Sequence, residues 1–79
     1  MTYLVTFRSH FDAILTNRAL KSAGVDVRLM PVPRSLSSSC GTCVVFPLAP
    51  GQPIPDRVEP PVEVEHVYRQ RGPDWELIQ

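Results

Sequence analysis

Two cysteines, Cys40 and Cys43, are the residues of this chain best suited to do chemistry, and only two positions separate them. They end a stretch that runs Met-Pro-Val-Pro-Arg-Ser-Leu-Ser-Ser-Ser-Cys-Gly-Thr-Cys from residue 30. Only the thiolate of a cysteine is a good nucleophile or metal ligand, and nearby cations favour that form. Arg34 is the local cation that can do so. The stretch therefore predicts sulfur chemistry, or metal binding through sulfur.

The residues beside Cys40 predict an exposed thiol. Gly41 has no Cβ, so the backbone next to Cys40 can turn sharply and stays open. The serine run that ends in Ser39 offers hydroxyl groups rather than packing. Cys43 begins a short apolar run, where it is either a second reactive thiol or a small core residue. The sequence leaves both interpretations of Cys43 open.

The first thirty residues predict a strand, a helix and a second strand. Residues 3–7 alternate and are rich in β-branched and aromatic side chains, which suits a strand. Ser9 is placed to cap a helix that Gly24 ends, and a row of apolar side chains starting at Phe11 forms its core face. Residues 25–30 alternate again. A helix between two strands favours a right-handed βαβ crossover with parallel pairing.

The second half is less regular, because eight of the nine prolines lie between residues 31 and 61. Apolar and alternating runs predict strands at 42–48 and 62–69, and a short arm at 75–78 that pairs back after a turn. We expect one domain over residues 1–79. Its parts are a βαβ unit (1–30), the cysteine loop and third strand (31–48), an extended proline-rich connection (49–61) and a terminal strand and hairpin (62–79).

These elements predict the α+β class. We expect a two-layer sandwich with one helix on a mixed sheet of four to five strands, ferredoxin-like or a related half-fold. A single helix covers only part of one sheet face. The proline-rich connection or a second copy of the chain is then expected to cover the other, and the second case predicts a homodimer.

The predicted topology also assembles a site. Parallel first and second strands bring their carboxyl ends to one edge of the sheet, where open α/β sheets bind ligands. Arg8, Ser9 and the start of the helix would meet the loop that carries Arg34 and Cys40 there. The candidate reactive residues are Cys40, Cys43 and Arg34, and the candidate groups that stabilise a thiolate or an anion are Gly41, Ser39, Arg8 and Ser9, with His10 as a weaker candidate.

Composition argues against several other functions. The net charge is +0 and the chain has no basic stripe, so we expect no nucleic-acid surface. No apolar segment approaches the roughly 20 residues that span a bilayer. The first residues lack the charged and apolar regions of a signal peptide, so we expect the cytoplasm, where thiols stay reduced.

Metal and cofactor chemistry have little support in the sequence. A structural zinc site needs four Cys or His ligands. The two cysteines have only His10 and His66 to join them, and neither histidine has ligand-type spacing. We interpret His66 as a strand residue, and we expect no metal and no cofactor. The sequence shows no acid–base pair, phosphate-binding glycine loop or nucleophile triad.

The chain resembles a family of small bacterial proteins, the selenium/sulfur (Se/S) carrier protein-like family. The resemblance lies in the opening strand, in Leu-Lys-Ser-Ala-Gly-Val at 20–25, and above all in Pro-Val-Pro-Arg at 31–34 with Ser-Ser-Ser-Cys-Gly at 37–41. It implies that Cys40 carries sulfur or selenium and that Arg34 is the arginine preceding it. Cys43 lies outside the general family pattern, so it is either a resolving thiol or an accident.

Three functions follow as hypotheses. In the first, Cys40 takes sulfur or selenium from a donor protein and hands it to an acceptor protein, which makes the chain a carrier rather than a stand-alone enzyme. In the second, Cys40 and Cys43 cycle between dithiol and disulfide. In the third, the protein is an interaction module whose cysteines take no part.

Overall fold

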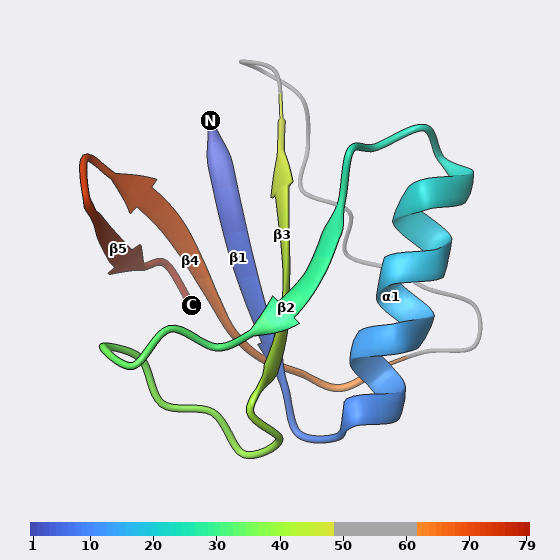
Figure 1. The fold of residues 1–79 in the computed structure, drawn as a ribbon, viewed down its shortest axis with the longest axis horizontal. Helices are drawn as coiled ribbons and strands as arrows, with labels where there is room; N and C mark the ends of the chain where they lie inside the picture. The colour runs from blue at the N-terminus through green and yellow to red at the C-terminus, as the bar shows by residue number, and fades with distance from the viewer. Residues whose placement is uncertain (49–61) are drawn as a thin grey trace.

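The computed structural model describes residues 1–48 and 62–79, which form one helix and five strands (Figure 1). In chain order these are β1 (Thr2–Phe7), α1 (His10–Ser22), β2 (Arg28–Pro31), β3 (Thr42–Pro47), β4 (Val64–Arg71) and β5 (Asp74–Leu77). The strands form one sheet in the order β2-β3-β1-β4-β5, and α1 packs on one face of it. The predicted α+β class, with one helix on a sheet, is confirmed for these residues.

The predicted parallel pairing of the first and second strands is wrong. β3 lies between β1 and β2 and pairs antiparallel with both, so β1 and β2 run in the same direction without touching. The two remaining pairs, β1 with β4 and β4 with β5, are also antiparallel, so the sheet is not mixed. The strand order therefore differs from that of a simple βαβ half-fold.

Burial explains why β3 displaces β2 from the position beside β1. β3 carries three buried side chains, Cys43, Val44 and Phe46, on its two faces. A strand at the centre of the sheet can have both of its faces covered. All four residues of β2 are exposed, and β2 ends at Pro31. Proline cannot donate to a strand ladder and is confined to edges, which suits β2 as an edge strand.

The predicted ends of the helix are confirmed. Ser9 has an extended backbone, and its hydroxyl accepts a hydrogen bond from the amide of Asp12 at 3.2 Å. Gly24 takes the left-handed conformation with φ 82°, and its amide donates to the carbonyl of Lys21 at 3.0 Å. These are the caps that the sequence pattern predicts for both ends of a helix.

The face that α1 turns to the sheet differs from the predicted one. Its buried residues are Ala13, Thr16 and Leu20, whereas Phe11 is 66% exposed. The spacing of three and then four residues is that of one helical face. Ala13 and Thr16 are small, so the helix backbone can approach the sheet closely, which the bulky row starting at Phe11 would prevent.

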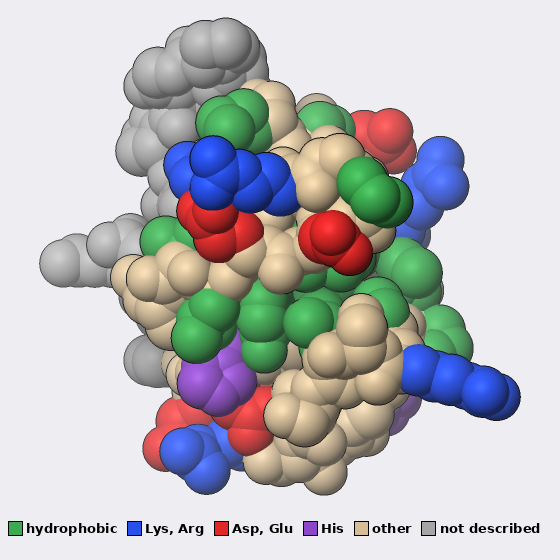
Figure 2. Space-filling model, turned by 90° about the vertical axis from the view of Figure 1, so that its left-hand side faces the viewer, with side chains coloured by type: hydrophobic (Ala, Val, Ile, Leu, Met, Phe, Trp, Pro, Cys, Tyr) green, Lys and Arg blue, Asp and Glu red, His purple; other side chains and the backbone are tan. Residues whose placement is uncertain are grey.

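The sheet separates two clusters of buried side chains. The cluster on the helix side consists of Val5, Phe7, Ala13, Leu20, Val27, Val44, Phe46, Leu48 and Val67. The cluster on the opposite face consists of Leu4, Cys43 and Tyr68, with Val32, Leu36, Val45 and Trp75 packed against it. Figure 2 shows the side away from α1, where hydrophobic side chains gather in the middle of the face.

The loop between β2 and β3 provides part of the cover on this opposite face. Val32 and Leu36, both from that loop, pack against the buried cluster there. The proline-rich segment 49–61, also expected to contribute cover, lies outside the described residues. The cysteine loop therefore has a structural role as well as any chemical one.

Candidate functional site

One edge of the sheet gathers the residues that the sequence singles out. β1 and β2 end there and β3 and β4 begin there, because Pro31 pairs with Thr42 and Phe7 pairs with Val64. The start of α1 joins the same edge through His10, whose Nδ1 lies 3.0 Å from the Thr42 hydroxyl. The loop that carries Cys40 leaves and re-enters the sheet at this edge.

Cys40 is a partly buried free thiol in that loop. It packs against the helix-side cluster, and its Sγ donates to the carbonyl oxygen of Thr42 at 3.3 Å. The Ser38 hydroxyl also lies near the sulfur, with Oγ 4.0 Å from Sγ. The thiol thus contacts one group that only accepts hydrogen bonds and one that can also donate them.

Gly41 gives the loop its turn beside Cys40. Its φ is +73°, a left-handed conformation that residues with a side chain rarely adopt. Its carbonyl oxygen accepts a hydrogen bond from the amide of Val32 at 3.0 Å, which joins the two ends of the loop. The predicted sharp turn next to Cys40 is confirmed.

Cys43 has a different environment from Cys40. It is 0% exposed, in the cluster on the opposite face of the sheet, with Sγ 3.8 Å from the carbonyl oxygen of Pro31. Burial, with a further contribution from the charge of Cys40, raises the pKa of the Cys43 thiol to about 11. A buried and protonated thiol is inert. The two cysteines therefore pack against opposite faces of the sheet.

Two of the candidate stabilising groups are already engaged elsewhere. The Ser9 hydroxyl caps α1. Arg8 lies 4.0 Å from Glu63, with both side chains largely exposed, and such ion pairs contribute little to stability.

Arg34 is exposed in the turn that follows β2, a turn closed by the 3.0 Å hydrogen bond from the amide of Leu36 to the carbonyl of Pro33. Among residues 1–48 and 62–79, no hydrogen bond or ion pair links Arg34 to another side chain. The structure brings Arg34 into the same loop as Cys40 but not into contact with its sulfur.

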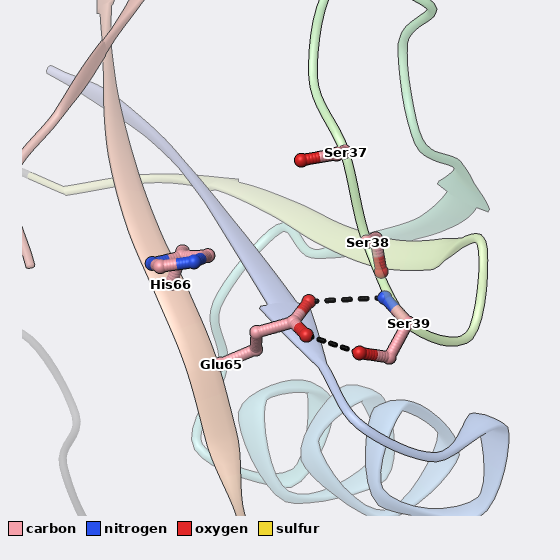
Figure 3. Close-up of a pocket in the computed structure, with 5 residues that line it drawn as sticks. All are labelled: Ser37, Ser38, Ser39, Glu65 and His66. Carbon is pink, nitrogen blue, oxygen red and sulfur yellow. Dashed lines mark hydrogen bonds between the residues drawn. The ribbon is translucent and has the colours of Figure 1, made fainter.

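Ser39 anchors the loop to β4. Its amide donates to Glu65 Oε1 at 3.1 Å, and its hydroxyl donates to Glu65 Oε2 (Figure 3). The two hydrogen bonds from Ser39 lower the pKa of the Glu65 carboxyl, and the charges of His66 and Arg8 lower it further. Glu65 is therefore ionised at neutral pH and accepts both bonds as a carboxylate.

An irregularity in β4 turns two neighbouring side chains toward the same space. Thr6 pairs with His66 and Phe7 pairs with Val64, so Glu65 has no partner on β1. An extra residue of this kind is a β-bulge, which can re-aim a side chain that would otherwise point to the other face. Glu65 and His66 consequently line one pocket together with Ser37, Ser38 and Ser39, with a volume of about 220 Å³ (Figure 3).

Sequence reasoning missed the contribution of β4 to this site. The sequence predicts His66 only as a strand residue and gives no signal for Glu65. A glutamate in an alternating strand is ordinary, and Glu65 lies 26 positions from Ser39. The bulge that re-aims it depends on pairing with β1, for which no local sequence signal exists.

Two features are absent from the residues that the structure describes. Within residues 1–48 and 62–79, no three His, Cys, Asp or Glu side chains gather in a way that could hold a metal ion. In the same residues, no helix has both the length and the apolar character needed to cross a membrane.

The chain belongs to the family described as putative Se/S carrier protein-like, whose family model matches residues 2–69. This membership confirms the resemblance that the cysteine loop suggests. The chain is also similar to the uncharacterized protein YtiA of Escherichia coli (strain K12). The two are 33% identical over 76 residues, which cover 96% of this chain and 87% of that protein. No solved structure matches the chain.

Proposed function

We propose that the protein carries a sulfur or selenium atom on Cys40 between a donor protein and an acceptor protein. The observation that carries this proposal is the contrast between the two thiols. Cys40 is partly exposed at the sheet edge, whereas Cys43 is fully buried with a pKa raised to about 11. Membership of a family described as Se/S carrier protein-like supports the same chemistry. We propose the cytoplasm as the compartment, because thiols stay reduced there.

The transfer needs no net oxidation or reduction. The Cys40 thiolate attacks the outer sulfur of a donor persulfide, R–S–SH, and a new S–S bond forms as the old one breaks. The donor leaves as the thiolate R–S⁻, and Cys40 holds the outer sulfur as Cys–S–SH. An acceptor thiolate then attacks that same outer sulfur and releases the Cys40 thiolate. Selenium in place of the outer sulfur follows the same two displacements.

Cys43 has no part in this transfer. The dithiol–disulfide alternative requires the Cys43 sulfur to leave its cluster with Leu4 and Tyr68 and to reach the loop. Burial and the raised pKa both oppose that movement. We therefore favour transfer of the outer atom over disulfide formation as the way Cys40 releases its cargo.

Mass spectrometry of the intact protein tests the proposal. The chain is incubated without reductant with a persulfide donor, R–S–SH, or with its selenium analogue, R–S–SeH. We expect a mass gain of one sulfur or selenium atom that Cys40→Ser abolishes. Cys43→Ala is the matched control and should load like the wild type, because alanine replaces the buried thiol by a small apolar group.

Three outcomes would contradict the proposal. Loading that survives Cys40→Ser would remove Cys40 from the reaction. A loss of two hydrogen atoms without an adduct would favour the redox pair instead. No reaction of any kind would favour an interaction module.

A further inference from the structure

The two groups that touch the Cys40 sulfur suit different protonation states. The Thr42 carbonyl oxygen, 3.3 Å away, only accepts hydrogen bonds, so it can bind the sulfur only while the thiol carries its proton. The Ser38 hydroxyl, 4.0 Å away, can donate a hydrogen bond. It therefore suits a sulfur that has lost its proton.

Ionisation of the Cys40 thiol changes which of its two contacts is favoured. A thiolate has no hydrogen to give to the Thr42 carbonyl, and its charge is repelled by the partial charge of that oxygen. A hydrogen bond from a hydroxyl to a charged acceptor is stronger than one between neutral groups. Loss of the proton thus weakens the contact with Thr42 and strengthens the contact with Ser38.

Ser38 is also a wall of the pocket between the loop and β4. The other walls are Ser37, Ser39, Glu65 and His66 (Figure 3). At about 220 Å³ the pocket is far larger than the roughly 10–15 Å³ that one water molecule needs by the same kind of measure. A single sulfur atom does not fill that space, which is large enough to admit the reactive end of another thiol.

The pocket keeps its shape through the anchor between Ser39 and Glu65. Both carboxylate oxygens of Glu65 are occupied by Ser39, which fixes the loop residue directly before Cys40. A thiol that enters the pocket therefore meets the wall that Ser39 and Glu65 fix and the Ser38 hydroxyl next to it.

We propose that this pocket receives the thiol or persulfide of the partner, and that Ser38 is a positioning residue that draws the ionised Cys40 sulfur toward it. The inference rests on the carrier function proposed above. In the loading step, the Cys40 thiolate forms a bond to the outer sulfur of R–S–SH in the pocket. The bond between that sulfur and R–S breaks, and R–S⁻ leaves with the electron pair.

Alkylation by iodoacetamide tests the role of Ser38 without any donor. All variants carry Cys43→Ala, so that Cys40 is the one thiol measured. We expect Ser38→Ala to slow alkylation of Cys40 at neutral pH by about tenfold or more, the loss of one hydrogen bond to a charged group. Ser38→Thr keeps the hydroxyl and should restore the rate. Ser35→Ala, at an exposed position of the same loop outside the pocket, is the control that should leave the rate unchanged.

Sulfur transfer to the same variants tests the pocket. The donors are glutathione persulfide and a protein that bears a persulfide on a cysteine, such as a cysteine desulfurase supplied with cysteine. Slower loading of Ser38→Ala from both donors supports a pocket for any thiol. Slower loading from the protein donor alone assigns the pocket to a partner's cysteine, and slower loading from glutathione persulfide alone assigns it to small thiols.

The two proposals fail in different ways. If the wild type takes up sulfur on Cys40 but Ser38→Ala matches Ser35→Ala in every assay, the inference is overturned and the carrier function stands. If the wild type takes up no sulfur while Ser38→Ala still slows alkylation, the carrier function is overturned and the effect of Ser38 on the thiolate stands.

Discussion

Ser39 and Glu65 are joined by two hydrogen bonds, although they lie 26 positions apart in the sequence. One residue precedes Cys40, and the other occupies the bulge at the start of β4. The pair fastens the cysteine loop to β4. The loop itself leads into β3, and β1 lies between β3 and β4 in the sheet. The position of the Cys40 sulfur therefore depends on β4 as well as on its own loop.

Replacement of the Glu65 carboxylate should loosen the loop. Glu65→Gln keeps the size of the side chain but turns one of its two acceptors into a donor, so it can no longer accept both bonds from Ser39. We expect faster hydrogen exchange at the amides of residues 39–41, with β3 and β1 unchanged. Glu63→Gln is the matched control, because Glu63 contacts only the exposed Arg8 through its side chain among the described residues. Equal exchange in the two variants would show that the anchor does not hold the loop.

The hydrogen bonds between Ser39 and Glu65 should break in acid. The pKa of Glu65 in the folded protein lies below the ordinary glutamate value of 4.5, chiefly because of the hydrogen bonds from Ser39. A lowered pKa means that the contribution of the carboxylate to stability is fully present above pH 4.5 and is lost as the pH falls through the folded pKa. An NMR titration of the Ser39 amide should therefore show a transition below pH 4.5. The transition should vanish in Glu65→Gln, and its persistence there would assign it to another group.

Much of the first half of the fold is predictable because its signals are local. Ser9 and Gly24 mark the helix ends through residues within one turn of the chain, and both caps are present. Strand pairing is not local. The sequence between β1 and β2 favours a parallel neighbour, but burial of Val44 and Phe46 places β3 between them. Which strand takes the centre depends on apolar residues that come later in the chain.

The residues of the candidate site also divide into those that local sequence predicts and those that it does not. Cys40 and Gly41 are predictable from residue type and spacing, because a polar run and a glycine favour an exposed turn. Ser9 is predictable as a cap, and that use of its hydroxyl removes it from the site. Glu65 and His66 reach the pocket only through the bulge opposite Thr6 and Phe7. That bulge is a property of two paired strands and not of either sequence alone.

The Cys43 thiol should stay unreactive in the folded protein. Burial raises its pKa from 9.0 to about 11, so below pH 9 the folded thiol is neutral and inaccessible. We expect iodoacetamide at pH 8 to label one cysteine in the native chain and two after denaturation. Peptide mapping should assign the native label to Cys40. Native labelling of Cys43 at a similar rate would show that its cluster opens readily.

The raised pKa of Cys43 also predicts how stability changes in base. An unfolded chain loses the Cys43 proton near 9.0, whereas the folded chain keeps it to about 11. The stability that the neutral thiol contributes is therefore fully present below pH 9 and is lost as the pH rises toward 11. Thermal melts across this range should show a falling Tm in the wild type and a weaker fall in Cys43→Ala. An equal fall of Tm in the two proteins would show that the Cys43 thiol does not cause it.

A side chain at position 41 should cost stability through the backbone alone. A Cβ built on Gly41 meets nothing within 4 Å, so no clash contributes, but the φ of +73° is left-handed. We expect Gly41→Ala to lower the free energy of unfolding by about 1–2 kcal/mol. Gly41→Asn should cost less, since asparagine visits this conformation more readily. Denaturant unfolding measures both, and equal losses for alanine and asparagine would contradict a purely conformational cause.

Arg34 should affect sulfur loading only through its charge. Its guanidinium is exposed and makes no hydrogen bond or ion pair with another described side chain, so solvent and salt screen its attraction for the Cys40 thiolate. We expect Arg34→Gln to slow loading of Cys40 at low ionic strength by about twofold to threefold, and the difference to vanish near 1 M salt, where the Debye length is about 3 Å. Arg34→Lys keeps the charge and should load like the wild type. A large loss of loading that persists at high salt, or that lysine fails to rescue, would instead indicate direct contact between the guanidinium and the cargo.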